Sequence, residues 1–133
     1  MRIVVDTNRI IASLIRDSYS RSLIYNNKFV FYTPAYAQEE INKYKGEIME
    51  KSGLNGVEFD ALFFALFEKI KVMALKTYDS FMVRSSKLIS DVKDVPFIAL
   101  CLALSADGIW SDDKDFVNQK DIRVFTTKEL LQI

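Results

Sequence analysis

Acidic side chains occupy four separate positions that suit metal-dependent chemistry. Asp6 directly follows the apolar Ile3–Val5, Glu40 lies in a later polar segment, and Asp94 precedes a long apolar run. The stretch 109–116, Ile-Trp-Ser-Asp-Asp-Lys-Asp-Phe, adds three carboxylates and one lysine. Converging carboxylates repel one another unless a cation compensates, and oxygen ligands suit Mg²⁺ or Mn²⁺ rather than zinc. Such a site lowers the pKa of a bound water and stabilises an in-line displacement at phosphorus.

Each of these carboxylates also has a purely structural interpretation. Asp6 fits a loop aspartate or a helix cap, and Asp94 fits a helix N-cap. Glu40 fits a solvated helical face. The last three carboxylates fit a polar turn that stays in water: Asp112, Asp113 and Asp115. Only their joint occurrence favours a shared site.

The composition excludes several classes of protein. The 133 residues contain no histidine, which removes serine–histidine triads, imidazole bases and histidine metal ligands. The single cysteine, Cys101, cannot form an intrachain disulfide or a structural zinc cluster. No apolar run reaches the roughly 18 residues that span a bilayer, and the first residues do not fit a signal peptide. We therefore expect a soluble, cytoplasmic protein with no membrane contact.

The charge balance limits what can be said about a nucleic-acid partner. Eighteen basic residues match eighteen acidic ones, so the average charge offers no attraction to phosphate. A nucleic acid must therefore be held by a local basic patch.

Alternating strands and helices are expected to position the carboxylates. Short apolar runs predict strands at 3–5, 29–32, 71–75, 109–110 and 122–125. Apolar periodicity and capping signals predict helices at 8–17, 33–44, 57–70, 78–89 and 94–104. Thr33 is expected to cap the second helix, with Pro34 in its first turn, and Thr126 with Glu129 predicts a capping box for a terminal helix.

This order of elements predicts one α/β domain over residues 1–133. The expected architecture is three-layer α/β/α, with a central, mainly parallel sheet of four to five strands. In an open parallel sheet, ligands bind beyond the carboxyl ends of the strands. Asp6 and residues 112–115 are both predicted at that edge, and the helices carrying Glu40 and Asp94 are able to lean over it.

With these positions identified, the chain resembles the PIN-domain ribonucleases over nearly its whole length. This group includes the toxins of many prokaryotic toxin–antitoxin operons. The matching motifs are Ile-Val-Val-Asp-Thr-Asn at 3–8, Gln-Glu-Glu-Ile at 38–41, Asp-Val-Pro-Phe-Ile-Ala-Leu at 94–100 and Ser-Asp-Asp-Lys-Asp-Phe at 111–116. By this register the second acidic position is Glu40, with Glu39 as its competitor, and the fourth is Asp113. The extra aspartate at 112 departs from the commonest pattern.

The resemblance implies a metal-dependent endoribonuclease. It implies that one or two Mg²⁺ or Mn²⁺ ions are bound, and water activated, by Asp6, Glu40, Asp94 and Asp113, with Asp112 as an additional candidate for metal contact. Supporting roles fall to Thr7, Asn8, Ser111 and Asp115. The expected substrate is single-stranded RNA, cleaved to leave a 5′ phosphate and a 3′ hydroxyl.

Basic side chains near the motifs are candidates for holding the RNA backbone. They are Arg9, Lys43, Lys93 and Lys114, and each of them fits an ordinary solubilising charge at least as well. Tyr36 and Tyr44 fit either base stacking or packing in the core. The apolar helix 57–70 indicates either deep burial or an interface. The resemblance favours a homodimer and, if an operon partner exists, an antitoxin that fills the acidic groove.

Two other functions compete with a nuclease. A non-catalytic RNA- or protein-binding module that retains the fold predicts binding without metal-dependent turnover. A phosphoacceptor domain also carries aspartates at strand ends, but only Lys76-Thr77-Tyr78-Asp79 follows the strand that would bear its phosphorylated residue.

Overall fold

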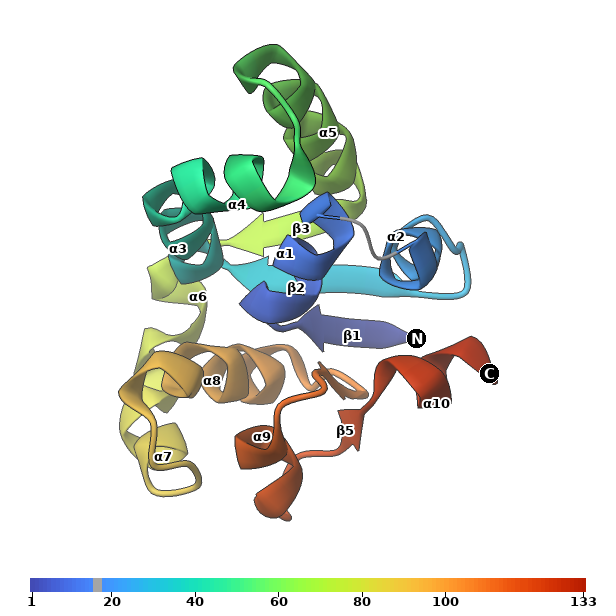
Figure 1. Ribbon diagram of the computed structural model, residues 1–133. Helices are drawn as coiled ribbons and strands as arrows, with labels where there is room; N and C mark the ends of the chain where they lie inside the picture. The colour runs from blue at the N-terminus through green and yellow to red at the C-terminus, as the bar shows by residue number, and fades with distance from the viewer. Residues whose placement is uncertain (16–17) are drawn as a thin grey trace.

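The protein is built on a five-stranded parallel sheet. A computed structural model describes residues 1–15 and 18–133. All four strand pairings are parallel, in the order β3-β2-β1-β4-β5. The strands are β1 (Arg2–Val5), β2 (Val30–Pro34), β3 (Ile70–Met73), β4 (Gly108–Trp110) and β5 (Val124–Phe125). This confirms the expected fold class, and the arrows of β1, β2 and β3 point the same way in Figure 1.

Helices flank the sheet. Within the described residues the α-helices are α1 (Thr7–Ile15), α2 (Ser18–Ile24), α3 (Ala35–Lys43), α4 (Lys45–Ser52), α5 (Gly56–Lys69), α6 (Leu75–Tyr78), α7 (Met82–Ser86), α8 (Val95–Leu104), α9 (Lys114–Asn118) and α10 (Thr127–Leu131). Two 3₁₀ turns are η1 (Asp79–Phe81) and η2 (Val92–Asp94). None of the helices in this described part is long and apolar enough to cross a membrane.

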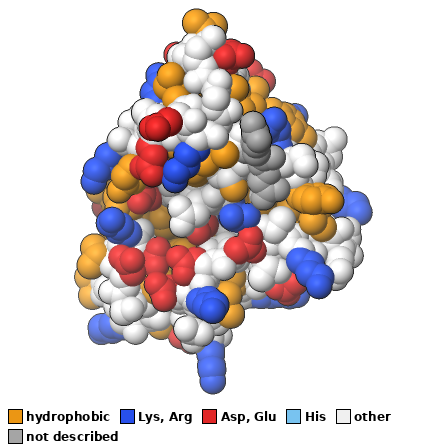
Figure 2. Space-filling view, viewed as in Figure 1, with side chains coloured by type: hydrophobic (Ala, Val, Ile, Leu, Met, Phe, Trp, Pro, Cys, Tyr) orange, Lys and Arg blue, Asp and Glu red, His pale blue; other side chains and the backbone are white. Residues whose placement is uncertain are grey.

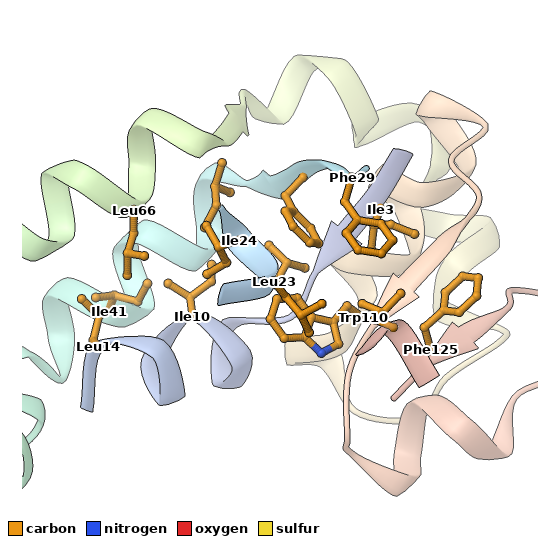
Figure 3. Close-up of a cluster of buried hydrophobic side chains, with 14 of the residues drawn as sticks. Ile3, Ile10, Leu14, Leu23, Ile24, Phe29, Ile41, Leu66, Trp110 and Phe125 are labelled. Carbon is orange, nitrogen blue, oxygen red and sulfur yellow. The ribbon is translucent and has the colours of Figure 1, made fainter. Parts of the chain in front are cut away.

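Two apolar cores lie on opposite faces of the sheet. Successive strand residues point to opposite faces, so Ile3 and Val5 enter one core while Val4 enters the other. The first core is closed by side chains of α1, α2, α4, α5 and α10, and Figure 3 shows part of it around Trp110. The second is closed by side chains of α6, α8 and α9. Helix α3 contributes to both.

The strand order places the ends of β1 and β4 side by side. The chain runs from β1 through β2 to β3 on one side of the sheet and then crosses back to β4 on the other side of β1, so strand order reverses between β1 and β4. Asp6 follows β1 and Ser111 follows β4. A Cβ at Gly108 would lie 2.6 Å from the carbonyl oxygen of Arg123. Only glycine therefore lets β4 and β5 approach this closely.

Several predicted elements need correction. Thr33 is not a helix cap, because it lies in β2 and its hydroxyl donates to the carbonyl oxygen of Val5. Pro34 is the N-cap residue of α3 rather than part of its first turn. The helix expected over 78–89 is broken into the end of α6, η1 and α7. Strand β3 begins one residue earlier than expected and ends at Met73.

Other predictions agree with the structure more closely. Helix α8 and the capping box of Thr126 with Glu129 both form as expected. The first predicted helix starts one residue early, at Thr7, and its predicted end at 16–17 lies outside the described residues. Helices α2 and α4 were not predicted.

Candidate metal centre

A cavity of about 300 Å³, called the acidic cavity below, opens at the carboxyl ends of β1 and β4. Its lining residues are Asp6, Thr7, Asn8, Glu40, Tyr44, Asp91, Lys93, Asp94, Phe97 and Asp113. All four carboxylates expected to bind metal are among them. Figure 2 shows a cluster of acidic side chains at the lower left with basic side chains near its border, and further acidic side chains elsewhere on this face.

Asp6 is held in a buried position at the end of β1. Its side chain is 5% exposed, and the hydroxyl of Ser111 donates to its Oδ2 at 2.9 Å. Burial raises the pKa of Asp6 to about 6, although the hydrogen bonds from Ser111 and from the backbone of Asn8 oppose that rise. Asp6 also begins α1, because its carbonyl oxygen accepts from the N–H groups of Arg9 and Ile10.

Ser111 connects two of the candidate ligands. Besides donating to Asp6, its hydroxyl oxygen accepts from the backbone N–H of Asp113 at 3.0 Å. Asp113 is the N-cap of α9, and its Oδ1 accepts from the N–H of Asp115 at 2.9 Å. One fully buried hydroxyl thus fixes the distance between the end of β1 and the turn that follows β4.

Glu40 reaches the cavity from α3. The hydroxyl of Thr7 donates to its Oε1 at 2.7 Å, which joins the first and second acidic motifs. Partial burial raises the pKa of Glu40, while the Thr7 hydrogen bond and the charge of Lys93 oppose the rise. Its neighbour Glu39 is exposed and does not line the acidic cavity.

Asp94 has the least compensated carboxylate. It ends η2 and occupies the N-cap position of α8 without making a side-chain capping bond. Its Oδ2 is buried and has no hydrogen-bond partner among the described residues. Burial and the charges of Asp91, Asp6, Asp113 and Asp115 raise the pKa of Asp94 to about 7. The N-cap interpretation therefore does not account for this side chain.

Asp91 joins the site although the sequence motifs did not include it. Carboxylate oxygens of Asp91, Asp94 and Asp115 all lie within 4.8 Å of one another. Asp91 caps η2 by accepting from the N–H of Lys93 at 2.9 Å. Its spacing of three residues before Asp94, across one turn, was the available signal. This trio shares only Asp94 with the expected four, so the acidic region is wider than the motifs imply.

Asp112 is turned toward α10 and α1. Its Oδ2 lies 2.8 Å from Nη1 of Arg9, and its two oxygens also accept from the N–H and hydroxyl of Thr127. The hydroxyl of Thr127 accepts in turn from the indole N–H of Trp110. Asp112 still lines a shallower hollow of about 240 Å³ together with Asp6, Asn8, Arg9 and Asp113.

The four basic candidates differ in their surroundings. Arg9 is engaged by Asp112. Lys93 lines the acidic cavity, and Lys43 lines a hollow next to it. Lys114 is exposed at the start of α9. Only Lys93 and Lys43 thus stand near the carboxylates without an ion pair to a described residue.

The donor set fits a hard divalent cation. Every candidate ligand in the acidic cavity offers oxygen, which suits Mg²⁺ or Mn²⁺ and not a thiolate- or imidazole-binding metal. A buried carboxylate oxygen without a partner, as at Asp94, carries a desolvation cost that a cation would remove. The acidic cluster is therefore consistent with metal binding.

Comparison with known proteins places the chain in a family. A chain of VapBC2 from Rickettsia felis, in a crystal structure bound to a DNA fragment from their promoter, has a similar fold, with a TM-score of 0.66 and 12% identity. The match covers 95% of this chain and 98% of that one. No curated protein matches the sequence. A family model described as PIN domain matches residues 4–132, so the chain belongs to the PIN domain family.

Proposed function

We propose that this protein is a metal-dependent endoribonuclease that hydrolyses phosphodiester bonds of single-stranded RNA. The observation that carries the proposal is the acidic cavity, where carboxylates from four distant segments converge and Asp94 keeps a buried oxygen without a partner among the described residues. Membership of a family whose members are typically nucleases supports it. Asp6, Glu40, Asp94 and Asp113 are the residues that would hold one or two Mg²⁺ or Mn²⁺ ions.

The metal would supply an activated water and neutralise charge that develops on the phosphate. The protein's own contribution is to hold the carboxylates in place. Ser111 holds Asp6 and the backbone of Asp113, and Thr7 holds Glu40. Asp94 has no such support from a hydroxyl of a described residue, and the carboxylates of Asp91 and Asp115 lie beside it. Asn8, exposed at the rim, is able to contact the substrate.

Attack by water predicts products with a 5′ phosphate and a 3′ hydroxyl. The RNA backbone must approach a negative site, which requires cations at the rim. Lys93 and Lys43 fit this role because they stand beside the carboxylates, whereas Arg9 is engaged by Asp112. Lys114, at the start of α9, is a weaker candidate.

The test is cleavage of an end-labelled single-stranded RNA by the unmodified protein and by Asp94→Asn, in Mg²⁺, Mn²⁺ and EDTA, with the product ends mapped. Asp121→Asn, at an exposed position, serves as the matched control. Metal-dependent cuts with 5′ phosphates that Asp94→Asn loses and Asp121→Asn retains support the proposal. Cuts that persist equally in Asp94→Asn and EDTA come from a contaminant and refute it, and RNA binding without turnover favours the non-catalytic module.

We further infer that a partner protein acts as an antitoxin. The likeness in fold to a chain of VapBC2 supports this inference. A homodimer is supported by α5, where Val57 is 81% and Phe64 is 68% exposed. Light scattering of the purified protein would give its mass, and a monomer at micromolar concentration would contradict the homodimer. Co-expression with the product of a neighbouring gene, followed by an RNA cleavage assay, would test inhibition.

A further inference from the structure

A second hollow, of about 180 Å³ and called the side hollow below, opens next to the acidic cavity. It is lined from α3, the C-cap of α3 and η2 by Tyr36, Glu39, Glu40, Lys43, Tyr44 and Lys93. Glu40, Tyr44 and Lys93 also line the acidic cavity. The two spaces therefore share a wall, and a chain that enters one is able to continue into the other.

Two residues of the shared wall, Glu40 and Tyr44, lie on one face of α3 and its C-cap, and Tyr36 extends that face into the side hollow. Tyr36, Glu40 and Tyr44 are spaced four residues apart, which brings their side chains to the same side of α3. The helical hydrogen bonding of α3 extends to Tyr44, because the N–H of Tyr44 donates to the carbonyl oxygen of Glu40 at 3.1 Å. A candidate metal ligand thus stands between two tyrosine rings.

Both tyrosines line the side hollow and are accessible from it. Tyr44 is 37% exposed, and Tyr36 is partly exposed. Neither phenol hydroxyl makes a side-chain hydrogen bond to a described residue. Nζ of Lys43 lies 5.5 Å from the centre of the Tyr44 ring, within the range of a cation–π contact. A positive charge is therefore held beside an aromatic ring.

We propose that the side hollow binds one unstacked base of the RNA, next to the scissile phosphate, with Tyr44 and Tyr36 as stacking platforms and Lys43 and Lys93 on the flanking phosphates. This proposal rests on the proposed function, because it takes the acidic cavity as the place where the phosphate is cleaved. In this arrangement, the two tyrosines and two lysines favour RNA whose bases are unpaired and unstacked.

A base fits this hollow better than a paired strand. Single-stranded RNA is read by proteins that stack its exposed bases on aromatic side chains and hold its backbone with basic ones. A double helix keeps its bases stacked, so it cannot place one in a recess in the protein surface. The combination of two tyrosines and two lysines beside a phosphate-cleaving site matches the single strand.

The experiment measures binding of fluorescent single-stranded RNA by anisotropy. An Asp94→Asn background prevents loss of the probe by cleavage. A set of RNAs carries one abasic nucleotide at successive positions, and we expect one position to weaken binding. In the same background, Tyr44→Ala is expected to raise Kd for the intact RNA by roughly 5- to 100-fold and to abolish the difference between intact and abasic RNA. Tyr44→Phe keeps the ring and is expected to bind normally.

The outcomes separate this proposal from the nuclease. Equal binding of intact and abasic RNAs, or an unchanged Kd in Tyr44→Ala, overturns the base site even when the unmodified protein cleaves RNA with metal. Base-dependent binding through Tyr44 without any cleavage supports the base site and refutes the nuclease. Circular dichroism verifies folding, and Tyr44→Leu, which retains apolar contacts without a ring, replaces Tyr44→Ala if that variant is unfolded.

Discussion

Asp6 and Asp94 face the same acidic cavity from different surroundings. Burial is the largest cause of the raised pKa of both carboxyls. For Asp6 the next causes, hydrogen bonds from Ser111 and from the backbone of Asn8, lower the pKa, which reaches about 6. For Asp94 every further cause is a neighbouring carboxylate, and the pKa reaches about 7 although this side chain is less buried.

The difference shows two ways of presenting an acidic ligand. The Asp6 side is preorganised by hydrogen bonds that are present whether or not a cation is bound. The Asp94 side is crowded by Asp91 and Asp115, so its carboxylates ionise together only at a cost that a cation would offset. We therefore expect the Asp94 side to respond more strongly to metal.

The largest expected effect is on catalysis. Asp6→Asn and Asp94→Asn should each lower kcat by roughly 10²–10⁴-fold, because each removes a charge that the cation requires. The two variants should differ in metal dependence. Raising Mn²⁺ should restore part of the activity of Asp94→Asn, where Asp91 and Asp115 remain, and little of that of Asp6→Asn. Identical Mn²⁺ titrations of the two variants would contradict the comparison.

Ser111→Ala is expected to lower kcat/KM by roughly 10–100-fold, the usual range for a residue that orients a ligand. It leaves Asp6 without its side-chain donor and the N–H of Asp113 without its acceptor. The matched control is Ser85→Ala, because Ser85 is equally buried and its hydroxyl has no partner among the described residues. Steady-state cleavage assays of both variants provide the test, and equal losses would show that Ser111 only fills space.

Stability without metal should fall as the pH rises. The folded-state pKa values of about 6 for Asp6 and about 7 for Asp94 exceed the ordinary value of 3.8, so the folded protein binds these protons more tightly than the unfolded chain. Their contribution is fully present below about pH 4 and is lost as the pH rises through about 6 and 7. At about 1.4 kcal/mol per pKa unit, the rise in the pKa of the buried Asp6 from 3.8 to about 6 corresponds to about 3 kcal/mol. Solvent screening reduces the share of the partly exposed Asp94 to roughly 1 kcal/mol, so the combined loss should be roughly 4 kcal/mol.

Urea unfolding in EDTA between pH 4 and 8 measures this loss. Asp94→Asn should match the unmodified protein near pH 4 and exceed its stability by roughly 1 kcal/mol at pH 8. Asp6→Asn should gain less, because the amide gives up the charge-assisted bond from Ser111. Adding Mn²⁺ at pH 8 should stabilise the unmodified protein most. If Asp6→Asn were more stable than Asp94→Asn at pH 8, the comparison between the two sides of the cavity would be reversed.

The smallest expected effect concerns Asp112, which stands beside the site and has partners for both oxygens. Asp112→Ala should lower the free energy of unfolding by roughly 1–2 kcal/mol, because Arg9 and Thr127 lose a shared acceptor. Asp60→Ala, which removes an exposed ion pair with Lys45, should cost roughly 0–0.5 kcal/mol. Urea unfolding of both compares them, and a loss of metal affinity in Asp112→Ala would instead make Asp112 a ligand.

Much of the secondary structure was predictable, because it depends on the local pattern of apolar and polar residues. Short apolar runs predicted β1 and β4, and a parallel sheet brings their carboxyl ends to one edge, so Asp6 and Asp113 were expected to be neighbours. The failures occurred where contacts distant in sequence decide the structure. Thr33 has the side chain of a cap, yet its hydroxyl bonds to Val5 on the adjacent strand. The helix predicted over 78–89 is interrupted although this segment contains no glycine or proline that would have indicated a break.

By itself, the sequence determined the kinds of ligand atom that the chain can offer and the α/β class of the fold. Oxygen ligands, the lack of histidine and the alternation of strands with helices follow from residue types and spacing. Only the tertiary structure decided which carboxylates have partners: Asp6 pairs with Ser111, Asp112 with Arg9, and Oδ2 of Asp94 with none of the described residues. The physical reason is that desolvation and hydrogen bonding depend on groups that folding brings together from positions about a hundred residues apart.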